Sequence, residues 1–154
     1  MKSNEIEIDF ENSIGPWLGR TMKMIDYYFY EAIKSEKLDV TKEQIIILKH
    51  LFYNDGMHQN EIARLIFRDK SSLARLLAKM EKKMYINRKK SKEDKRINNV
   101  FITALGKEMF VKSRPIIKKI MNTMEQNIAS KEQQTMIVLL KQIQNNFGLT
   151  IETL

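Results

Sequence analysis

Basic side chains are concentrated in one stretch of the chain, where they could bind phosphate groups. Residues 64–96 contain 13 lysines and arginines but only four acidic residues, Asp69, Glu81, Glu93 and Asp94, which gives this stretch a formal charge of +9. The whole chain of 154 residues has a net charge of +8, so the other 121 residues sum to −1. Lysine and arginine release condensed counterions when they neutralise phosphates. A solvated helix face is the alternative for a lysine-rich stretch, but this concentration of charge favours a polyanionic partner.

Part of this charge follows the period of a helix. Asp69 can cap a helix whose buried side is formed by Leu73, Leu76, Leu77, Met80 and Met84. The opposite face carries Lys70, Ser71, Arg75 and Lys79. A helix fits the major groove of DNA, where each base pair presents its own pattern of donors and acceptors. The sequence therefore predicts a DNA-reading helix here.

Two further elements would position this helix. A short helix is expected from about His58 to Ile66, immediately before it. After Tyr85 the pattern changes, and residues 86–90 and 98–102 predict two strands separated by a charged tip at 91–96. A hairpin with a cationic tip suits the narrow, electronegative minor groove. Together these elements outline a winged helix-turn-helix.

Amphipathic helices are predicted on both sides of this unit. Apolar residues at three-and-four spacing predict a first helix over roughly 14–36, and Thr41 with Gln44 has the spacing of a capping box for a second. Thr103 is expected to cap a long helix that Pro115 should kink, and Ser130 with Gln133 a last helix. The length allows one domain with an accessory helical layer.

The sequence gives little support to several other classes of function. The chain has no cysteine, Gly-rich phosphate loop or metal-ligand cluster, and His50 and His58 stand alone as packing or capping residues, so we expect no enzyme, cofactor or metal site. We expect no signal peptide, because residues 1–13 alternate acidic and apolar residues and lack a basic segment and an unbroken apolar core. No apolar run approaches the roughly 20 residues of a membrane span, so we expect a cytoplasmic protein. A membrane-surface helix would need a broader apolar face. A winged-helix module that binds only proteins remains the alternative, although the basic face disfavours it.

The central part of the chain resembles the MarR family, the multiple-antibiotic-resistance regulators. The resemblance rests on HQNEIARLIFRDKSSLARLLAKMEKKMYINR, which begins at His58, followed by EDKRINNVFITALG. Residues 94–96 correspond to the Asp-x-Arg motif of the wing, Ile102 and Thr103 to the Leu-Thr pair that starts helix five, and Gly106 to the glycine that follows. The resemblance covers about 50 residues closely, and the flanking helices agree in number and length.

This resemblance, with the positions of the residues, predicts a DNA interface. Arg75 is the expected reader of a guanine, with Ser71 and Ser72 at base edges and phosphates and with Lys70 and Lys79 on phosphates. In the wing, Arg96 or a neighbouring lysine should reach the minor groove, and Asp94 should brace the loop. The predicted DNA-binding residues are Lys70, Ser71, Ser72, Arg75, Lys79, Arg88, Lys92, Asp94, Lys95 and Arg96.

The resemblance also implies a fold and partners. It predicts a mainly α fold, a winged helix-turn-helix with a two-stranded wing plus N- and C-terminal dimerisation helices. Residues 12–36 and 107–154 would form the dimerisation helices and 40–103 the DNA-binding lobe of one domain. The expected partners are double-stranded DNA at a palindromic operator, a second copy of the chain and a small aromatic or anionic effector. The effector is expected near Trp17, Arg20 and His50, although Trp17 as core and Arg20 as surface is the alternative.

One residue departs from the family pattern. Met84 stands where the family usually has a glycine at the end of helix four. A glycine suits a left-handed helix cap, which costs a residue with a side chain about 1 kcal/mol or more. We therefore expect this helix to end differently and the wing to shift slightly.

Overall fold

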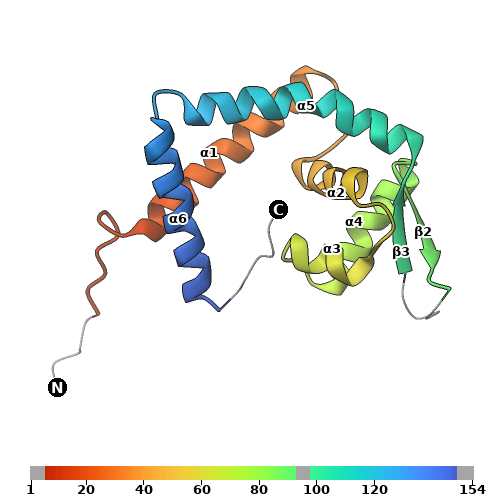
Figure 1. The fold of residues 1–154 in the computed structure, drawn as a ribbon, viewed down its shortest axis with the longest axis horizontal. Helices are drawn as coiled ribbons and strands as arrows, with labels where there is room; N and C mark the ends of the chain where they lie inside the picture. The colour runs from red at the N-terminus through yellow and green to blue at the C-terminus, as the bar shows by residue number, and fades with distance from the viewer. Residues whose placement is uncertain (1–5, 93–97, 149–154) are drawn as a thin grey trace.

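The computed structural model describes residues 6–92 and 98–148, and its elements follow the expected order (Figure 1). The helices are α1 (Ile14–Ser35), α2 (Lys42–Tyr53), α3 (Gln59–Leu65), α4 (Lys70–Lys82), α5 (Ala104–Glu125) and α6 (Ser130–Asn146). The strands are β1 (Met57–His58), β2 (Ile86–Lys90) and β3 (Asn98–Ile102). The described part of the chain is mainly helical, which confirms the predicted fold class.

The core lies in a lobe formed by α2, α3, α4 and the sheet. Side chains from each of these elements are almost wholly buried there, namely Ile47, Leu48, Leu51, Ile62, Leu73, Leu77, Met80, Ile86 and Val100. The strands pair antiparallel in the order β1-β3-β2. The two wing strands match their predicted bounds, whereas β1 was not expected. Two residues are too few to show an alternating pattern, and β1 forms because Met57 pairs with Val100.

Side chains fix the starts of the main helices. Thr41 and Gln44 form the predicted capping box, with Gln44 N donating to Thr41 Oγ1 at 3.3 Å and Thr41 N donating to Gln44 Oε1 at 3.1 Å. Thr103 caps α5 by accepting from Gly106 N at 3.0 Å. The expected box at Ser130 is wrong, because α6 has Ala129 at its N-cap and Glu132 accepts from the Ala129 N–H at 2.9 Å.

The end of α4 differs from the expectation for Met84. Met84 itself adopts the left-handed conformation, with φ at +59°. Tyr85 N donates to Met80 O at 3.0 Å and Met84 N to Glu81 O at 2.9 Å, as in a glycine-capped helix. The helix therefore ends in the usual way, and the expectation that it would end differently is wrong. The strain stays in the backbone of Met84.

Gly106 is required by a close approach of two segments. A Cβ atom at this position would lie 2.1 Å from the backbone oxygen of Tyr85. Thr103 N also donates to that oxygen, at 3.0 Å. The start of α5 is thus fixed directly against the end of α4, which links the wing to the long helix behind it.

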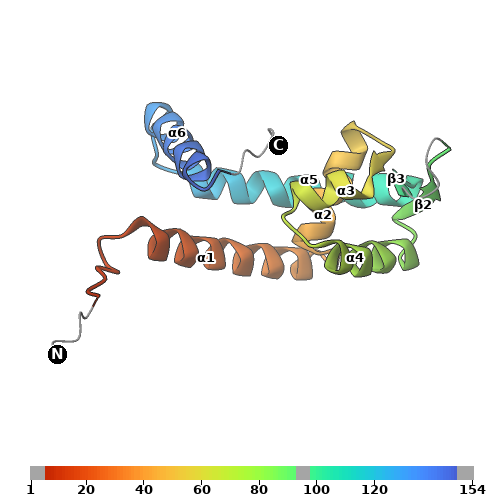
Figure 2. The same cartoon turned by 90° about the horizontal axis from the view of Figure 1, so that it is seen from below.

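The long helices extend away from the lobe and leave apolar surface uncovered. α1 and α5 pack on each other, and α6 lies at the end opposite the lobe (Figure 2). α5 continues through Pro115 as one helix, so the proline does not interrupt it. No side chain of α6 is buried in the single chain. The exposed apolar residues include Trp17, Met22, Met24, Tyr27 and Tyr28 on α1, Val111, Met121 and Met124 on α5, and Met136, Ile137, Val138 and Leu139 on α6.

Candidate nucleic-acid interface

Helix α4 is held by its buried leucines and presents a basic face. Asp69 caps it as predicted, accepting from Ser72 N at 2.8 Å, and this bond is the first cause that holds the pKa of Asp69 below its ordinary value. Lys70, Ser71, Arg75 and Lys79 are exposed on the outer side. None of these three cations forms an ion pair within 4.0 Å with another described residue. Their charge is therefore available to an external anion.

Ser72 lies closer to the protein than the other predicted contacts. Its hydroxyl accepts a hydrogen bond from Arg68 Nη1 at 2.5 Å, and Arg68 also binds both carboxylate oxygens of Glu43 on α2. This group of three side chains was not predicted from the sequence. Glu43 and Arg68 are 25 residues apart, and only the packing of α2 against the turn before α4 brings them together.

The wing is braced against α4 by a second ion pair. Arg88 on β2 donates from Nη2 and Nε to Glu81 Oε2 on α4, at 2.7 and 3.2 Å, and its backbone N–H binds the same carboxylate. The hydrogen bond from Arg88 is the main reason that the pKa of Glu81 lies below its ordinary value. Arg88 was predicted to contact DNA, and the structure engages its guanidinium with α4.

The tip of the wing is described only in part. Lys92 is exposed, whereas the predicted residues Asp94, Lys95 and Arg96 lie outside the described residues. On the neighbouring strands, the Lys89 Nζ lies 5.5 Å from the centre of the Phe101 ring. The hairpin therefore carries cationic side chains as far as Lys92, the last described residue before its tip.

The predicted effector residues lie on two different helices of the single chain. Arg20 lies over the Trp17 ring, with its Cζ 5.4 Å from the ring centre, at the exposed start of α1. His50 lies on α2, where its Nε2 is buried with no hydrogen-bond partner among the described residues. Desolvation, and secondarily the charge of Lys49, lowers the pKa of His50.

A cavity of about 820 Å³ lies elsewhere, between α1, the start of α2 and the turn after α3. Its apolar lining includes Tyr30, Ile33, Ile46, Leu65 and Phe67, with charged groups such as Lys34 and Glu43 around it. Trp17, Arg20 and His50 are not among its lining residues. The sequence did not indicate this cavity.

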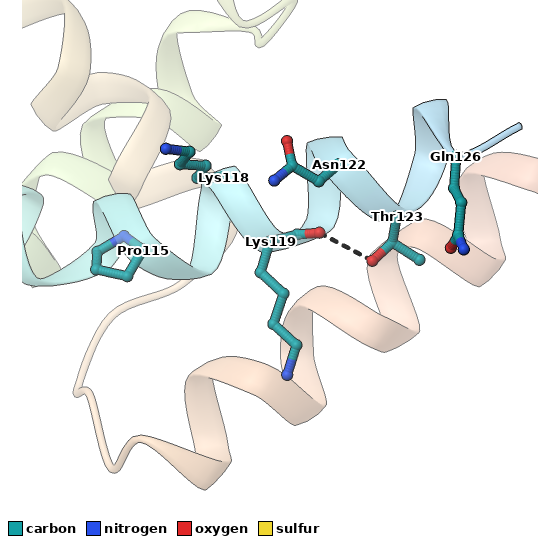
Figure 3. A pocket seen from close by; sticks show the side chains of 6 residues that line it. All are labelled: Pro115, Lys118, Lys119, Asn122, Thr123 and Gln126. Atoms are coloured by element: carbon teal, nitrogen blue, oxygen red, sulfur yellow. Dashed lines mark hydrogen bonds between the residues drawn. The ribbon is translucent and has the colours of Figure 1, made fainter. Parts of the chain in front are cut away.

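A smaller hollow of about 500 Å³ lies on α5 (Figure 3). Its lining residues are Pro115, Lys118, Lys119, Asn122 and Thr123 of this helix, together with its C-cap Gln126. The Thr123 hydroxyl donates to the backbone oxygen of Lys119 at 2.9 Å, so it is already satisfied within the helix. In the part of the chain that the structure describes, no group of three metal-ligating side chains is found. None of the described helices is both long and apolar enough to cross a membrane.

Comparison with known proteins gives a shared fold, and a match to one family model over the central part of the chain. The model of the MarR family matches residues 40–97, which include α2, α3, α4 and β2. The HTH-type transcriptional regulator YybA of Bacillus subtilis is 26% identical over 114 residues, covering 74% of this chain and 76% of YybA. The match therefore extends beyond the DNA-binding lobe.

Two solved structures show how much of the fold is shared. A MarR protein from Peptoclostridium difficile superimposes with a TM-score of 0.80 at 22% identity, covering 95% of each chain. S. aureus MepR, solved as a DNA complex, superimposes with a TM-score of 0.79 at 23% identity, covering 88% of this chain and 99% of MepR. The long helices are thus shared along with the lobe. The family model, the sequence relative and the fold agree: residues 40–97 match the MarR family model, and the chain shares the fold of these winged helix-turn-helix proteins.

Proposed function

We propose that this chain is a sequence-specific, DNA-binding transcriptional regulator that acts as a homodimeric repressor on a palindromic operator. One observation carries the proposal: Lys70, Arg75 and Lys79 are exposed on one helix, without an ion pair to another described residue. Cations on an exposed helix beside a hairpin match the major and minor grooves of one duplex. Similarity to MepR, which was solved with DNA, supports the same partner.

In this proposal α4 enters the major groove. Arg75 donates two hydrogen bonds to a guanine, since its planar guanidinium matches the O6 and N7 acceptors. Lys70 and Lys79 bind phosphates and fix the register, with Ser71 and Ser72 near the backbone and base edges. In the wing, Arg96 or the neighbouring Lys92 or Lys95 reaches the adjacent minor groove, and Asp94 braces the loop. Arg88 contributes chiefly by holding the wing to Glu81.

The dimer follows from the uncovered apolar surface. α6 buries no side chain within one chain, although Ile137, Val138 and Leu139 lie on it. A second copy would cover this surface, with residues 12–36 and 107–154 of each chain in the interface. The lobes at 40–103 would then meet two half-sites about one helical turn, or roughly 10 base pairs, apart.

A small-molecule effector would act on this dimer without touching DNA. The cavity of about 820 Å³ adjoins both α1 and the turn before α4, so an occupant would contact the dimer layer and the reading lobe together. The stacked Trp17 and Arg20 at the start of α1 form a second place where an aromatic anion could bind. An effector can shift the spacing of the lobes only by its difference in affinity for the two spacings.

Selection of genomic DNA fragments by the purified protein tests the proposal. We expect a recovered palindrome whose half-sites lie about one turn apart, because a two-fold dimer presents two α4 helices in this way. A winged-helix module that binds only proteins is the alternative, and it would enrich no sequence. Enrichment of a single unpaired half-site would retain DNA binding and refute the dimeric arrangement.

A further inference from the structure

Arg68 occupies the junction between three elements of the reading lobe. It is the last residue before the Asp69 cap of α4, and its side chain is half-buried. Its Nε and Nη2 donate to Glu43 Oε1 at 3.0 and 2.5 Å, and Nη2 also donates to Glu43 Oε2 at 2.7 Å. Its Nη1 donates to Ser72 Oγ at 2.5 Å. One planar group thus joins the start of α2 to the first turn of α4.

This arrangement leaves Arg68 little capacity to bind DNA itself. The Glu43 carboxylate neutralises its charge through a forked contact, which is the strong geometry for this pair. The remaining Nη1 is directed at Ser72. Arg68 therefore differs from Arg75, which is exposed on the outer face of α4 and has no carboxylate within 4.0 Å among the described residues.

The contact with Arg68 also determines which hydrogen-bonding positions of the Ser72 hydroxyl remain free. A serine hydroxyl has one donor and two acceptor positions. Arg68 fills an acceptor position, and the Ser72 backbone N–H is bound by Asp69. No described residue accepts from the Ser72 hydroxyl, so its proton is available to an acceptor outside the lobe. Ser72 lies in the first turn of α4, where helix N-terminal groups commonly meet phosphates.

We propose that Arg68 is a positioning residue that holds the first turn of α4 against α2 and presents the Ser72 hydroxyl as a donor to a phosphate oxygen of the operator. The inference rests on the proposed function, since it assigns one contact within the same interface. A neutral hydroxyl releases no counterion of its own, so this contact should strengthen binding without adding to its salt dependence.

The test compares operator affinity across a range of salt concentrations for Arg68→Lys, Arg68→Ala, Ser72→Ala and the double variant Arg68→Ala/Ser72→Ala. Each single substitution should weaken operator binding about tenfold, because a charge-assisted arrangement at the interface is lost. The double variant should be no weaker than the single ones, because both act through the same contact. The slope of log affinity against log salt should not change.

Arg68→Lys distinguishes positioning from direct contact, since lysine keeps the charge and loses the fork. If Arg68 bound phosphate, Arg68→Ala would reduce the slope by about 0.9 per subunit and Arg68→Lys would restore it. The inference would be overturned by that change in slope, by wild-type affinity in Arg68→Lys, or by additive losses in the double variant. An unchanged melting temperature in Arg68→Lys would show that its loss of affinity does not come from unfolding.

Lys42→Ala is the matched control. It removes a comparably exposed ion pair, between Lys42 and Asp26, from the residue next to Glu43 and leaves α4 untouched. Its operator affinity should equal that of the wild type, and a tenfold loss would show that any ion pair near α2 has the same effect. Absence of operator binding by the wild type would refute the proposed function and the inference with it. Wild-type binding with an insensitive Arg68→Lys would refute the inference alone.

Discussion

Among the described residues, Arg68 and Arg88 of the basic segment are engaged within the protein, whereas Arg75 is not. Arg68 and Arg88 bind Glu43 and Glu81, whereas Arg75 has no carboxylate within 4.0 Å in the described part of the chain. A paired arginine has little charge left for a phosphate, while an exposed one keeps both its charge and its fork. The two arginines that brace the interface thus differ from Arg75, the expected reader of a base.

Arg75→Ala and Lys79→Ala should separate base reading from phosphate binding. Arg75→Ala is expected to weaken operator binding by about 1 to 3 kcal/mol and to reduce the preference over random DNA, because a base contact carries sequence information. Lys79→Ala should weaken binding to both DNAs equally. Competition binding with both duplexes measures this difference. Identical behaviour of the two variants would refute the roles assigned on α4.

The Glu81 pair should make the stability of the lobe depend on acid pH. Because Arg88 lowers the pKa of Glu81 in the folded state, its contribution is present above about pH 4.3, the ordinary value for glutamate, and is lost as pH falls through the lowered pKa. Glu81→Gln should cost about 0.2 to 1 kcal/mol at pH 7, since the carboxylate is 38% exposed. Urea unfolding at pH 7 and pH 3 should show that the difference in free energy of unfolding between wild type and Glu81→Gln becomes smaller at pH 3. If this difference stayed constant, the Glu81–Arg88 ion pair would be excluded as its source.

At the scale of elements, the wing begins with a strained residue. Met84 holds φ at +59° between α4 and β2, and its carbonyl accepts from the Thr103 hydroxyl at 2.6 Å. The side chain itself is 67% exposed, so it contributes little to packing. The surrounding bonds thus hold Met84 in a conformation that favours glycine.

Met84→Gly is expected to stabilise the protein by about 0.5 to 1 kcal/mol. Relief of the left-handed backbone contributes roughly 1 to 2 kcal/mol, and the greater freedom of glycine in the unfolded chain offsets part of it. Met84→Ala removes the same side chain but keeps the strain, so it should give no gain. Urea unfolding of the three proteins measures this. Equal stabilisation by alanine would show that the Met84 side chain, not its backbone, is unfavourable.

The sequence predicted those elements whose signals are local. The change of pattern after Tyr85 predicted β2 and β3, and the spacing of Thr41 and Gln44 predicted the start of α2. It did not predict β1, which has two residues and depends on β3 for pairing. The bonds of Arg68 to Glu43 were missed for the same reason, because they arise only when α2 packs against the turn before α4. The N-cap of α6 was wrongly predicted at Ser130 because two adjacent residues, Glu132 and Gln133, both suit the start of a helix.

At the scale of the whole molecule, the main feature is the apolar surface of the long helices. α1, α5 and α6 project apolar residues into solvent, although α1 and α5 also contribute to the core, with Phe29, Ile33, Phe110 and Ile116. Exposed apolar surface of this extent on a helical layer is typical of a subunit interface. We therefore expect these helices to form the interface of a dimer whose two lobes face one duplex.

The dimer should persist at low concentration. Sedimentation at sub-micromolar concentration is expected to show a species of about twice the chain mass. Leu139→Glu, on the exposed face of α6, should dissociate it, because a charge at the centre of an apolar interface lacks a partner. Circular dichroism should still show the lobe folded, since α6 buries no side chain within one chain. A stable wild-type monomer that binds one half-site as tightly as the full palindrome would refute the arrangement.

The salt dependence of DNA binding tests the central claim most directly. Fluorescence anisotropy of a labelled operator duplex, titrated from low to high salt, gives the slope of log affinity against log salt. If the exposed cations of α4 and the wing neutralise phosphates, the slope should be several times steeper than −0.9, and Lys79→Ala should reduce its magnitude by about 0.9 per subunit. A slope near zero for the wild-type protein would contradict the assignment of this basic face to DNA.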